Sequence, residues 1–270
     1  MNRNVRFDAL VLSVKETAQD NRSACLLTKS GVEWATLFGG PKSKLRGAVS
    51  PWNSGVAYIY KNEEKNSAKI TDFDVQKFHP TFRENLFKSF AAALAGEIVV
   101  KSKCAGSPEQ CFVLANGFLD GMDLCDEGAA RLGLLRFLWR YMDLLGVRPQ
   151  VEFCARCSKR LVSIASAGNF IQSALESDAG GNSCFLYSQA ENAFVCPDCR
   201  SAQEKGLWLS ASALAYLQIS AQSQTAGMAA ARKAVVCGRD YLDLKAFLFE
   251  LVESALGIKL KTLESGKGIL

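Results

Sequence analysis

Cys154-Ala-Arg-Cys157 and Cys196-Pro-Asp-Cys199 decide the fold of the second half of this 270-residue chain. Each Cys-x-x-Cys pair forms a tight turn that directs two sulfurs toward one ion, so the two pairs supply four thiolates. Four thiolates complete a tetrahedron and leave no position for water. The spacing therefore predicts one structural zinc ion per chain, held by Cys154, Cys157, Cys196 and Cys199 in a zinc-ribbon module.

Disulfide bonding and thiol redox chemistry are two other interpretations of these cysteines. Ten Cys in 270 residues is too few for a disulfide scaffold, and the other six are scattered singly. A redox motif needs one Cys-x-x-Cys at the start of a helix, whereas both pairs here have turn-like surroundings. The 38 residues between the pairs exceed the spacing of a compact ribbon. We expect short strands in this insert at 169–172, 184–187 and 193–195, with a polar turn at 190–192.

The first 80 residues are predicted to form a small barrel. Five short apolar or alternating runs, separated by polar or glycine-rich turns, are typical of β-strands. They span 7–14, 24–28, 31–38, 55–60 and 68–75. Five strands in about 75 residues favour a closed barrel of the OB type, which buries one face of each strand and has no long free edge.

From residue 81 onward the apolar residues recur with helical spacing. Thr81-Phe-Arg-Glu84, a capping box, and Ser107-Pro-Glu-Gln110 each match a helix start. A third helix is expected over 127–146, and helical patterns resume at Ser210 and at Asp240. The predicted fold class is multidomain α+β, with an N-terminal OB-fold β-barrel (1–79), an α-helical domain (80–150 and 205–270) and an inserted four-cysteine zinc-ribbon module (151–204).

Positive charge is concentrated in the predicted barrel. Residues 1–80 contain 12 Lys or Arg against 8 Asp or Glu, which is most of the net charge of +5. The acid-free segment 34–62 interleaves cations with Trp34, Trp52, Tyr58 and Tyr60. Cations neutralise phosphates and rings stack on unpaired bases, so the pattern favours a DNA-binding surface; a solvated loop beside core aromatics is the alternative. The leading candidate contacts are Lys42, Lys44 and Arg46, followed by Lys15, Arg22, Lys61, Lys65 and Lys69.

Residues suited to catalysis are scarce. The single histidine, His79, is expected to be structural, so a histidine-based triad lacks its base. Asp120, Asp123 and Asp126 recur every three residues near a helix end, where capping is expected rather than cation binding. The segment 39–44 lacks the glycine that a phosphate-binding loop needs before its lysine. We therefore expect a protein that is not an enzyme.

The order of these parts resembles the RecO family of bacterial recombination mediators. The resemblance covers essentially the whole chain. It rests on Lys42-Ser-Lys-Leu-Arg46 in the barrel, Leu135-Arg-Phe-Leu-Trp-Arg140 and Leu144-Leu-Gly-Val-Arg-Pro149 in the helical domain, the two cysteine pairs, and the closing Leu256-Gly-Ile-Lys-Leu-Lys261.

The resemblance implies a DNA-binding mediator of recombinational DNA repair in the RecFOR pathway. Such a protein binds single- and double-stranded DNA, anneals complementary strands, and helps RecR load RecA onto DNA covered by single-strand binding protein. The family's zinc is structural. The family also binds the acidic C-terminal tail of single-strand binding protein on the helical domain, where Arg136 and Arg140 are the candidate partners for its carboxylates. Ordinary surface charge is the alternative role for these two arginines.

Two other function classes stay open. A zinc-ribbon protein-protein adaptor without direct nucleic-acid binding would use its barrel to dock peptides, and a thiol-dependent oxidoreductase would need a reactive Cys154 or Cys196. The first residues lack the apolar core of a secretory signal, and polar residues interrupt the longest uncharged stretch, 206–231. We therefore expect a cytoplasmic, nucleoid-associated protein without membrane contact.

Overall fold

The computed structural model describes residues 3–17, 20–40, 43–162, 184–201, 203–222 and 225–270. The chain divides into two compact units. Unit 1 comprises Met1–Ala130 and Lys259–Leu270, and unit 2 comprises Arg131–Ile258. The sequence predicts three domains, and this finer division stays a prediction. No helix among the described residues is long and apolar enough to cross a membrane.

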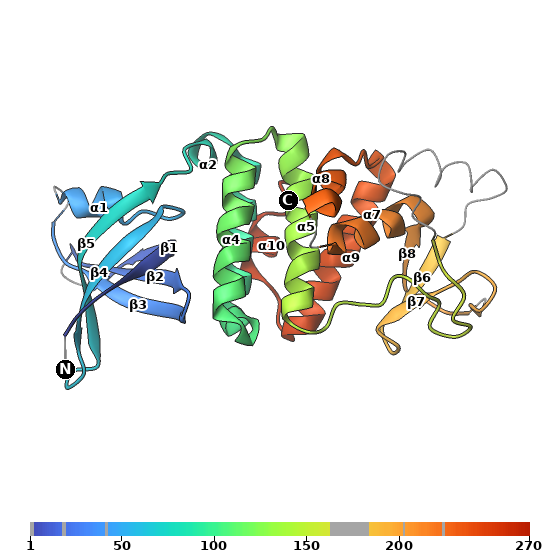
Figure 1. Cartoon of the computed structure of the whole chain (residues 1–270), viewed down its shortest axis with the longest axis horizontal. Helices are drawn as coiled ribbons and strands as arrows, with labels where there is room; N and C mark the ends of the chain where they lie inside the picture. Colours follow the sequence, from blue (N-terminus) through green and yellow to red (C-terminus); the bar gives the residue numbers. More distant parts are fainter. Residues whose placement is uncertain (1–2, 18–19, 41–42, 163–183, 202, 223–224) are drawn as a thin grey trace. The chain divides into compact units, whose positions relative to one another are not determined.

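Unit 1 begins with a closed five-stranded barrel, as the sequence predicts (Figure 1). Its strands are β1 (Asn4–Glu16), β2 (Arg22–Thr28), β3 (Gly31–Leu37), β4 (Ser54–Asn62) and β5 (Ser67–Lys77). The strand order is β1-β2-β3-β5-β4, and pairing of β1 with β4 closes the barrel. Strands β3 and β5 pair in parallel, and a short helix, α1 (Lys44–Ala48), lies between β3 and β4 in the chain. This arrangement is OB-like.

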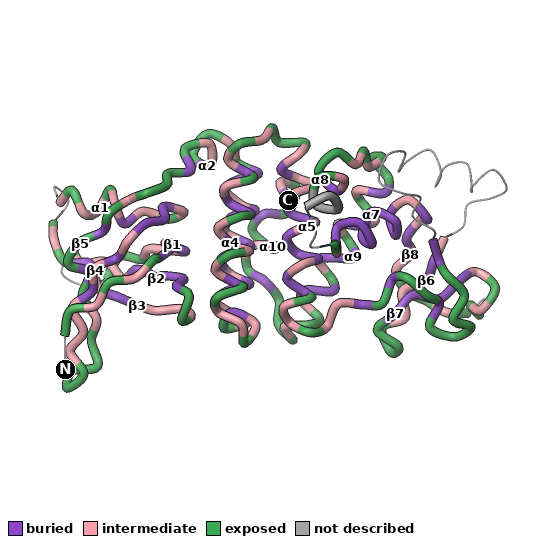
Figure 2. The backbone as a smooth tube through the Cα atoms, viewed as in Figure 1, coloured by how far each residue is buried: buried purple, intermediate pink, exposed green. Residues whose placement is uncertain are grey.

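Alternation along the strands explains the barrel core. Side chains of one parity point inward, and Figure 2 shows buried residues recurring along the barrel strands. The buried core comprises Ala9, Val11, Ala24, Leu26, Ala35, Leu37, Val49, Ala57, Ile59, Ile70 and Phe73. Gly55 on β4 is required by a close approach, because a Cβ there would lie 2.0 Å from the carbonyl oxygen of Asp74 on β5.

Helices cover part of the outer barrel face. Outward-facing Leu10 and Leu12 on β1, and Cys25 and Leu27 on β2, are buried because β1 contacts α3 and β2 contacts α4. The helical elements of unit 1 are α2 (Thr81–Glu84), α3 (Leu86–Lys101), the 3-10 helix η2 (Lys103–Gly106), α4 (Pro108–Asp123), the first residues of α5 (Glu127–Leu144), and α10 (Lys261–Ser265).

The predicted capping box at Thr81 is wrong. The helix expected from Thr81 onward is divided into a single turn, α2, and the longer α3, with Asn85 between them. Asn85 is the side-chain cap of α3, since its Oδ1 accepts from the backbone N–H of Lys88 at 2.9 Å. The Thr81 hydroxyl instead donates to the Asp123 carboxylate at 2.7 Å, a partner that only the tertiary fold supplies.

His79 links the barrel to the helices inside unit 1. Its side chain is 2% exposed, with Nδ1 2.6 Å from the carbonyl oxygen of Trp52 and Nε2 3.0 Å from the Asp120 carboxylate. The aspartates near the end of α4 all bind protein groups. Asp120 contacts Lys77 and His79, Asp123 accepts from Thr81, and Asp126 accepts from the backbone N–H of Ala129 at the start of α5. These contacts match the structural roles that the sequence predicts.

Unit 2 packs a three-stranded sheet against helices. Its elements are the rest of α5, β6 (Cys184–Ser188), β7 (Ala193–Val195), β8 (Leu207–Ser210), α7 (Ala211–Ala221), α8 (Thr225–Lys233) and α9 (Gly238–Leu256), and the sheet order is β7-β6-β8. The ring of Phe247 on α9 lies 5.0 to 6.3 Å, between centroids, from the rings of Tyr187, Phe194 and Trp139. The sheet therefore shares one aromatic core with α5 and α9.

Several sequence predictions for unit 2 are confirmed. The strands expected at 184–187 and 193–195 are β6 and β7. Helices begin near Ser210 and Asp240, as predicted: Ser210 caps α7 by accepting from the backbone N–H of Ala213, and α9 starts at Gly238. Strand β8 was not predicted, and the strand expected at 169–172 lies outside the described residues.

Candidate functional site

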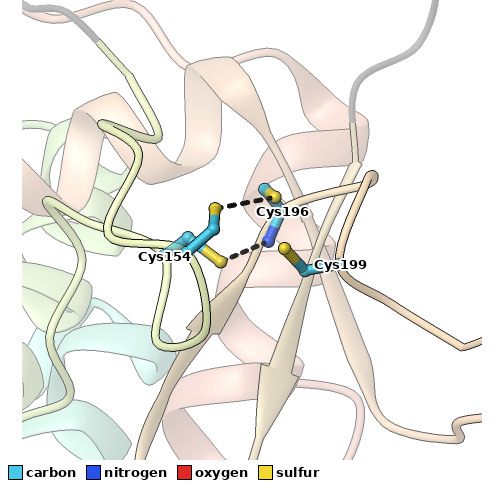
Figure 3. Close-up of side chains that lie close together, drawn as sticks. Cys154, Cys196 and Cys199 are labelled. Atoms are coloured by element: carbon cyan, nitrogen blue, oxygen red, sulfur yellow. Dashed lines mark hydrogen bonds between the residues drawn. The ribbon is translucent and has the colours of Figure 1, made fainter.

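The four predicted metal ligands come together in unit 2. Cys154 and Cys157 form one turn, closed by the Ser158 N–H donating to the Cys154 carbonyl at 3.0 Å. Cys196 follows β7, and the Cys199 N–H donates back to its carbonyl at 3.1 Å. All four sulfurs lie within 4.8 Å of one another, and none is in a disulfide (Figure 3). Among the described residues, this is the group of Cys, His, Asp and Glu placed to hold a metal ion.

The spacing of the sulfurs fits a tetrahedral thiolate site. The Sγ atoms of Cys157 and Cys196 are 3.7 Å apart. A zinc ion with Zn–S bonds of about 2.3 Å would place its four sulfurs roughly 3.8 Å from one another. Because all four ligands are sulfur, the site favours a soft or borderline ion and has no oxygen donor for a hard cation. An ion bound by all four sulfurs would have no open ligand position.

The surroundings shift the pKa values of the clustered cysteines in opposite directions. Although burial opposes ionisation of Cys154, the backbone N–H groups of Cys196, Cys157 and Arg156 lower its pKa to about 6. Hydrogen bonds with Cys157 and Cys196 raise the pKa of Cys199 to about 12. Ionisation of Cys154 is therefore favoured while ionisation of Cys196 and Cys199 is opposed, which is a conflict among neighbouring thiols. A divalent ion removes this conflict, because it stabilises all four thiolates together.

The barrel presents a second candidate site on the outer face of β3. Ala35 and Leu37 point into the core, so Trp34, Thr36 and Phe38 point outward. Trp34 is 47% exposed and Phe38 is 48% exposed, which is unusual for large aromatic side chains in a folded protein.

A lysine lies over each of these rings. Lys15 Nζ is 5.8 Å from the centre of the Trp34 ring, and Lys69 Nζ is 5.1 Å from the centre of the Phe38 ring. Strand register places the lysines at the two ends of one row, in which Lys15 pairs with Ser23, Ser23 with Thr36, and Thr36 with Lys69. We call Lys15, Trp34, Phe38 and Lys69 the barrel patch.

The loop that contains Lys42, Lys44 and Arg46 offers fewer accessible cations than its composition suggests. Lys42 lies outside the described residues, and Lys44 is exposed on α1. Arg46 is committed to the protein, because its guanidinium donates to the carbonyls of Gly39 and Asp20 and its side chain is only 12% exposed. Arg46 thereby joins two loops of the barrel, and few of its N–H donors remain for a phosphate.

The remaining cation candidates of the barrel are paired or peripheral. Arg22 forms an ion pair with Glu16 at 2.7 Å, and Lys61 forms one with Glu33 at 2.8 Å. Lys65 is exposed in the turn between β4 and β5. Among the aromatic residues of the acid-free segment, Trp52 packs onto Gly96 of α3, where a Cβ would lie 3.3 Å from its ring.

Phe38 is the patch residue that sequence reasoning missed. The composition pattern points to Trp and Tyr residues, and Phe38 enters only as the last residue of the predicted strand 31–38. The signal for Phe38 is parity, because it directly follows β3, two residues beyond Thr36 and four beyond Trp34.

Arg136 and Arg140 on α5 lie half-buried within unit 2. Arg136 donates to the Tyr216 hydroxyl at 3.1 Å and to the Ala231 carbonyl at 3.3 Å. Arg140 donates to the carbonyl of Ser220 at 3.0 Å, at the end of α7. Burial, together with the charges of Arg136 and Arg232, lowers the pKa of Arg140. The oxygens that accept from these two arginines are neutral, and the contacts join α5 to α7 and α8.

Comparison with known proteins identifies the family. The family model described as "Recombination protein O C terminal" matches residues 83–264. A protein named DNA repair protein RecO from Syntrophobacter fumaroxidans is 24% identical over 163 residues, which is 60% of this chain and 64% of that protein. A protein of the same name from Moorella thermoacetica is 23% identical over 199 residues, 73% of this chain and 66% of that protein. The aligned parts thus span just under two thirds of these relatives. Since the model match covers well over half of the chain, the chain belongs to the RecO family.

Proposed function

We propose that this chain binds single-stranded DNA through the barrel patch and acts in recombinational DNA repair. The observation that carries the proposal is the pairing of each half-exposed ring with a lysine, Lys15 with Trp34 and Lys69 with Phe38. The matching relatives are named for DNA repair, which agrees with this chemistry.

The patch offers both interactions that an unpaired strand needs. An exposed ring stacks on a base of any sequence, contributing about 1–3 kcal/mol for each base. A lysine beside the ring neutralises the adjoining phosphate and releases its counterion. Because duplex DNA keeps its bases stacked inside, the two rings favour an unpaired strand, whereas the lysines serve either form.

The wider mediator role is proposed from the family. We infer that the protein anneals complementary strands and helps RecR load RecA onto DNA covered by single-strand binding protein, without catalysing a reaction. In this proposal the four cysteines hold one zinc ion, which stabilises unit 2 and takes no part in chemistry.

The tail of single-strand binding protein is proposed to bind at Arg136 and Arg140. Both cations face neutral oxygens, so an acidic tail would supply the opposite charge that those contacts lack. A carboxylate binding there has to share or replace the bonds to Tyr216 and Ser220.

Fluorescence anisotropy with a labelled single-stranded oligonucleotide tests the DNA-binding proposal. If three or four phosphates are neutralised, log K should fall against log[salt] with a slope of about −2 to −3. Lys15→Ala with Lys69→Ala should make the slope shallower, whereas Lys101→Ala, at the exposed end of α3, removes a positive charge without changing it. Failure of the wild-type protein to bind any oligonucleotide would refute the proposal and favour the protein-protein adaptor.

A further inference from the structure

Arg156, between the two ligands of the first cysteine turn, reaches across to the second. Its Nη1 donates to the Cys199 carbonyl at 2.9 Å and to Glu204 Oε2 at 3.1 Å. Its Nε donates to Glu191 Oε1 at 3.1 Å, and its Nη2 contacts both Glu191 and Glu204. These five contacts match the five N–H donors of a guanidinium, so its hydrogen-bonding capacity is fully used.

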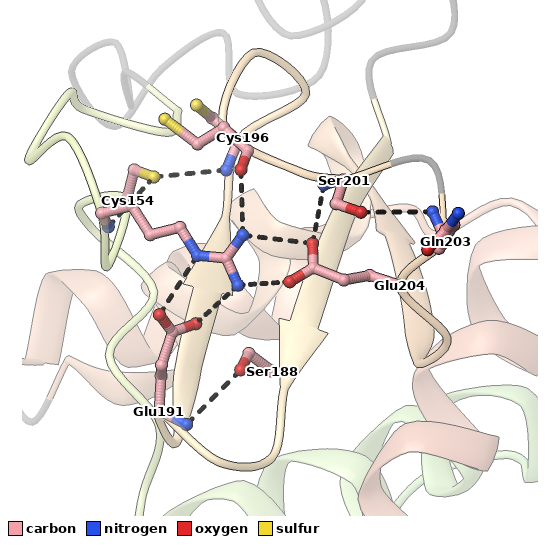
Figure 4. A network of polar contacts seen from close by, with 9 residues as sticks. Cys154, Ser188, Glu191, Cys196, Ser201, Gln203 and Glu204 are labelled. Atoms are coloured by element: carbon pink, nitrogen blue, oxygen red, sulfur yellow. Dashed lines mark hydrogen bonds and ion pairs between the residues drawn. The ribbon is translucent and has the colours of Figure 1, made fainter.

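Further hydrogen bonds hold the Glu204 carboxylate and the Glu191 backbone. The backbone N–H of Ser201 donates to Glu204 Oε2 at 2.8 Å, and the backbone N–H of Glu191 donates to the Ser188 hydroxyl at 3.4 Å. Figure 4 shows Glu191 and Glu204 on either side of the guanidinium, close below Cys154 and Cys196. The network therefore connects the first cysteine turn with the β6–β7 turn, the second cysteine turn and the segment leading to β8.

We propose that Arg156 is a positioning residue for the four-cysteine metal site, which it prearranges by fixing the second cysteine turn against the first. The inference rests on the proposed metal site and is independent of DNA binding. An arginine suits this role because its planar fork makes several directed bonds at once, whereas a lysine offers a single charged point.

The contribution is geometric, not a matter of neutralising charge. Four thiolates with a divalent ion carry two negative charges, and Arg156 alone would offset part of this. Glu191 and Glu204 reverse that effect, since one guanidinium with two carboxylates has a net charge of −1. Both acids stay ionised, because their hydrogen bonds with Arg156 lower the pKa of each carboxyl. A purely electrostatic role would not need them.

Lys159 provides a matched control. It also joins the two cysteine turns, through an ion pair with Asp198 at 3.3 Å. Its side chain is 69% exposed and that of Asp198 is 75% exposed, so this pair is solvated and makes one contact. The side chain of Arg156 is 31% exposed and makes five.

Competition between the full-length protein and a zinc chelator of known affinity tests the proposal. Arg156→Ala should weaken zinc binding on the order of 10- to 100-fold, the range for residues that orient metal ligands. Arg156→Lys keeps the charge and most of the stem, yet should not restore affinity. Lys159→Ala should stay within about threefold of the wild type, as expected for an exposed pair. Cobalt(II) spectra should show a distorted tetrahedral site in both Arg156 variants and an unchanged one in Lys159→Ala.

A double-mutant cycle separates positioning from general destabilisation. If Arg156 acts through Glu204, adding Glu204→Ala to Arg156→Ala should cost little further zinc affinity. Zinc affinity of Arg156→Ala or Arg156→Lys equal to that of Lys159→Ala would overturn the proposal while leaving the metal site intact. Absence of stoichiometric zinc from the wild-type protein would overturn both.

Discussion

The lysines of the barrel patch and Arg156 of unit 2 differ in how many of their N–H donors the fold already uses. Lys15 and Lys69 lie over half-exposed rings, where a ligand can reach them. Arg156 directs all five of its N–H donors at carbonyl and carboxylate oxygens of its own unit. The number of cations in a segment therefore says little about ligand binding. What matters is how many donors the fold has already used.

The largest expected effect is on unit 2. Cys154→Ser, or removal of the metal by a chelator, should abolish cooperative folding of unit 2, because four-thiolate zinc sites contribute roughly 10–16 kcal/mol in zinc-finger peptides. Thermal unfolding with and without chelator measures the loss. The barrel should still bind an oligonucleotide. A Cys154→Ser protein that folds normally but has lost DNA binding would show that the cysteines, not the barrel, contact DNA.

The next effect is on the barrel patch. Trp34→Ala and Phe38→Ala should each weaken single-strand binding by about 1–3 kcal/mol, with a smaller effect on duplex DNA. Anisotropy titrations with matched single- and double-stranded oligonucleotides give both values. Phe78→Ala is the control, since Phe78 is 62% exposed but lies outside the patch. Equal losses from Phe78→Ala and Phe38→Ala would mean that the patch has no special role.

The contacts of Asp120 with Lys77 and His79 are expected to stabilise unit 1 and to have no part in DNA binding. Partial burial alone would raise the pKa of Asp120, but hydrogen bonds from Lys77 and His79 hold it below its usual value. Asp120→Asn should therefore cost about 1.5–3 kcal/mol at neutral pH, the range for hydrogen bonds to charged groups. Chemical denaturation measures this cost, and DNA affinity should not change.

The stabilisation that Asp120 provides should be lost in acid. A depressed carboxyl pKa gives stability that is complete above the unfolded-state value of about 3.9 and is lost as pH falls through the lower folded-state value. The wild type and Asp120→Asn should therefore converge in stability in strong acid. A difference that persists unchanged at low pH would mean that the carboxylate charge is not responsible.

The smallest expected effects distinguish the lysines of the barrel patch from Arg46, which binds backbone carbonyls. Lys15→Ala or Lys69→Ala should each reduce the salt slope by about 0.7 and cost about 1 kcal/mol or less of single-strand affinity at physiological salt. Arg46→Ala should leave the slope unchanged and lower thermal stability instead, since Arg46 joins two loops. A reduced slope in Arg46→Ala with unchanged stability would restore the basic loop as the contact surface.

Much of the backbone could be predicted because it depends on local patterns. Strand alternation predicts β1 to β5, and the cysteine spacing predicts the four sulfurs that the fold brings together. The capping box at Thr81 shows the limit. A threonine followed three residues later by a glutamate satisfies the local rule, but Asp123, 42 residues away, takes the hydroxyl.

The hydrogen-bond partners of long side chains could not be predicted from the sequence. Arg46 and Arg140 find backbone carbonyls that no spacing rule points to, and Arg156 finds two glutamates 35 and 48 residues away. Phe38 was recoverable from strand parity, because its neighbours on the opposite face are small or aliphatic core residues. Local sequence thus indicates which way a residue points more readily than which partner it meets.

Photocrosslinking tests most directly the claim that the barrel, and not the four-cysteine region, contacts DNA. A single-stranded oligonucleotide carrying halogenated bases would be irradiated in complex with the zinc-loaded protein, and the crosslinked residues identified by mass spectrometry. Base-stacked rings are the expected attachment points, so crosslinks should map to Trp34 and Phe38 on the barrel. Crosslinks that map to residues 152–161 or 196–205 instead, with none on β3, would contradict the claim.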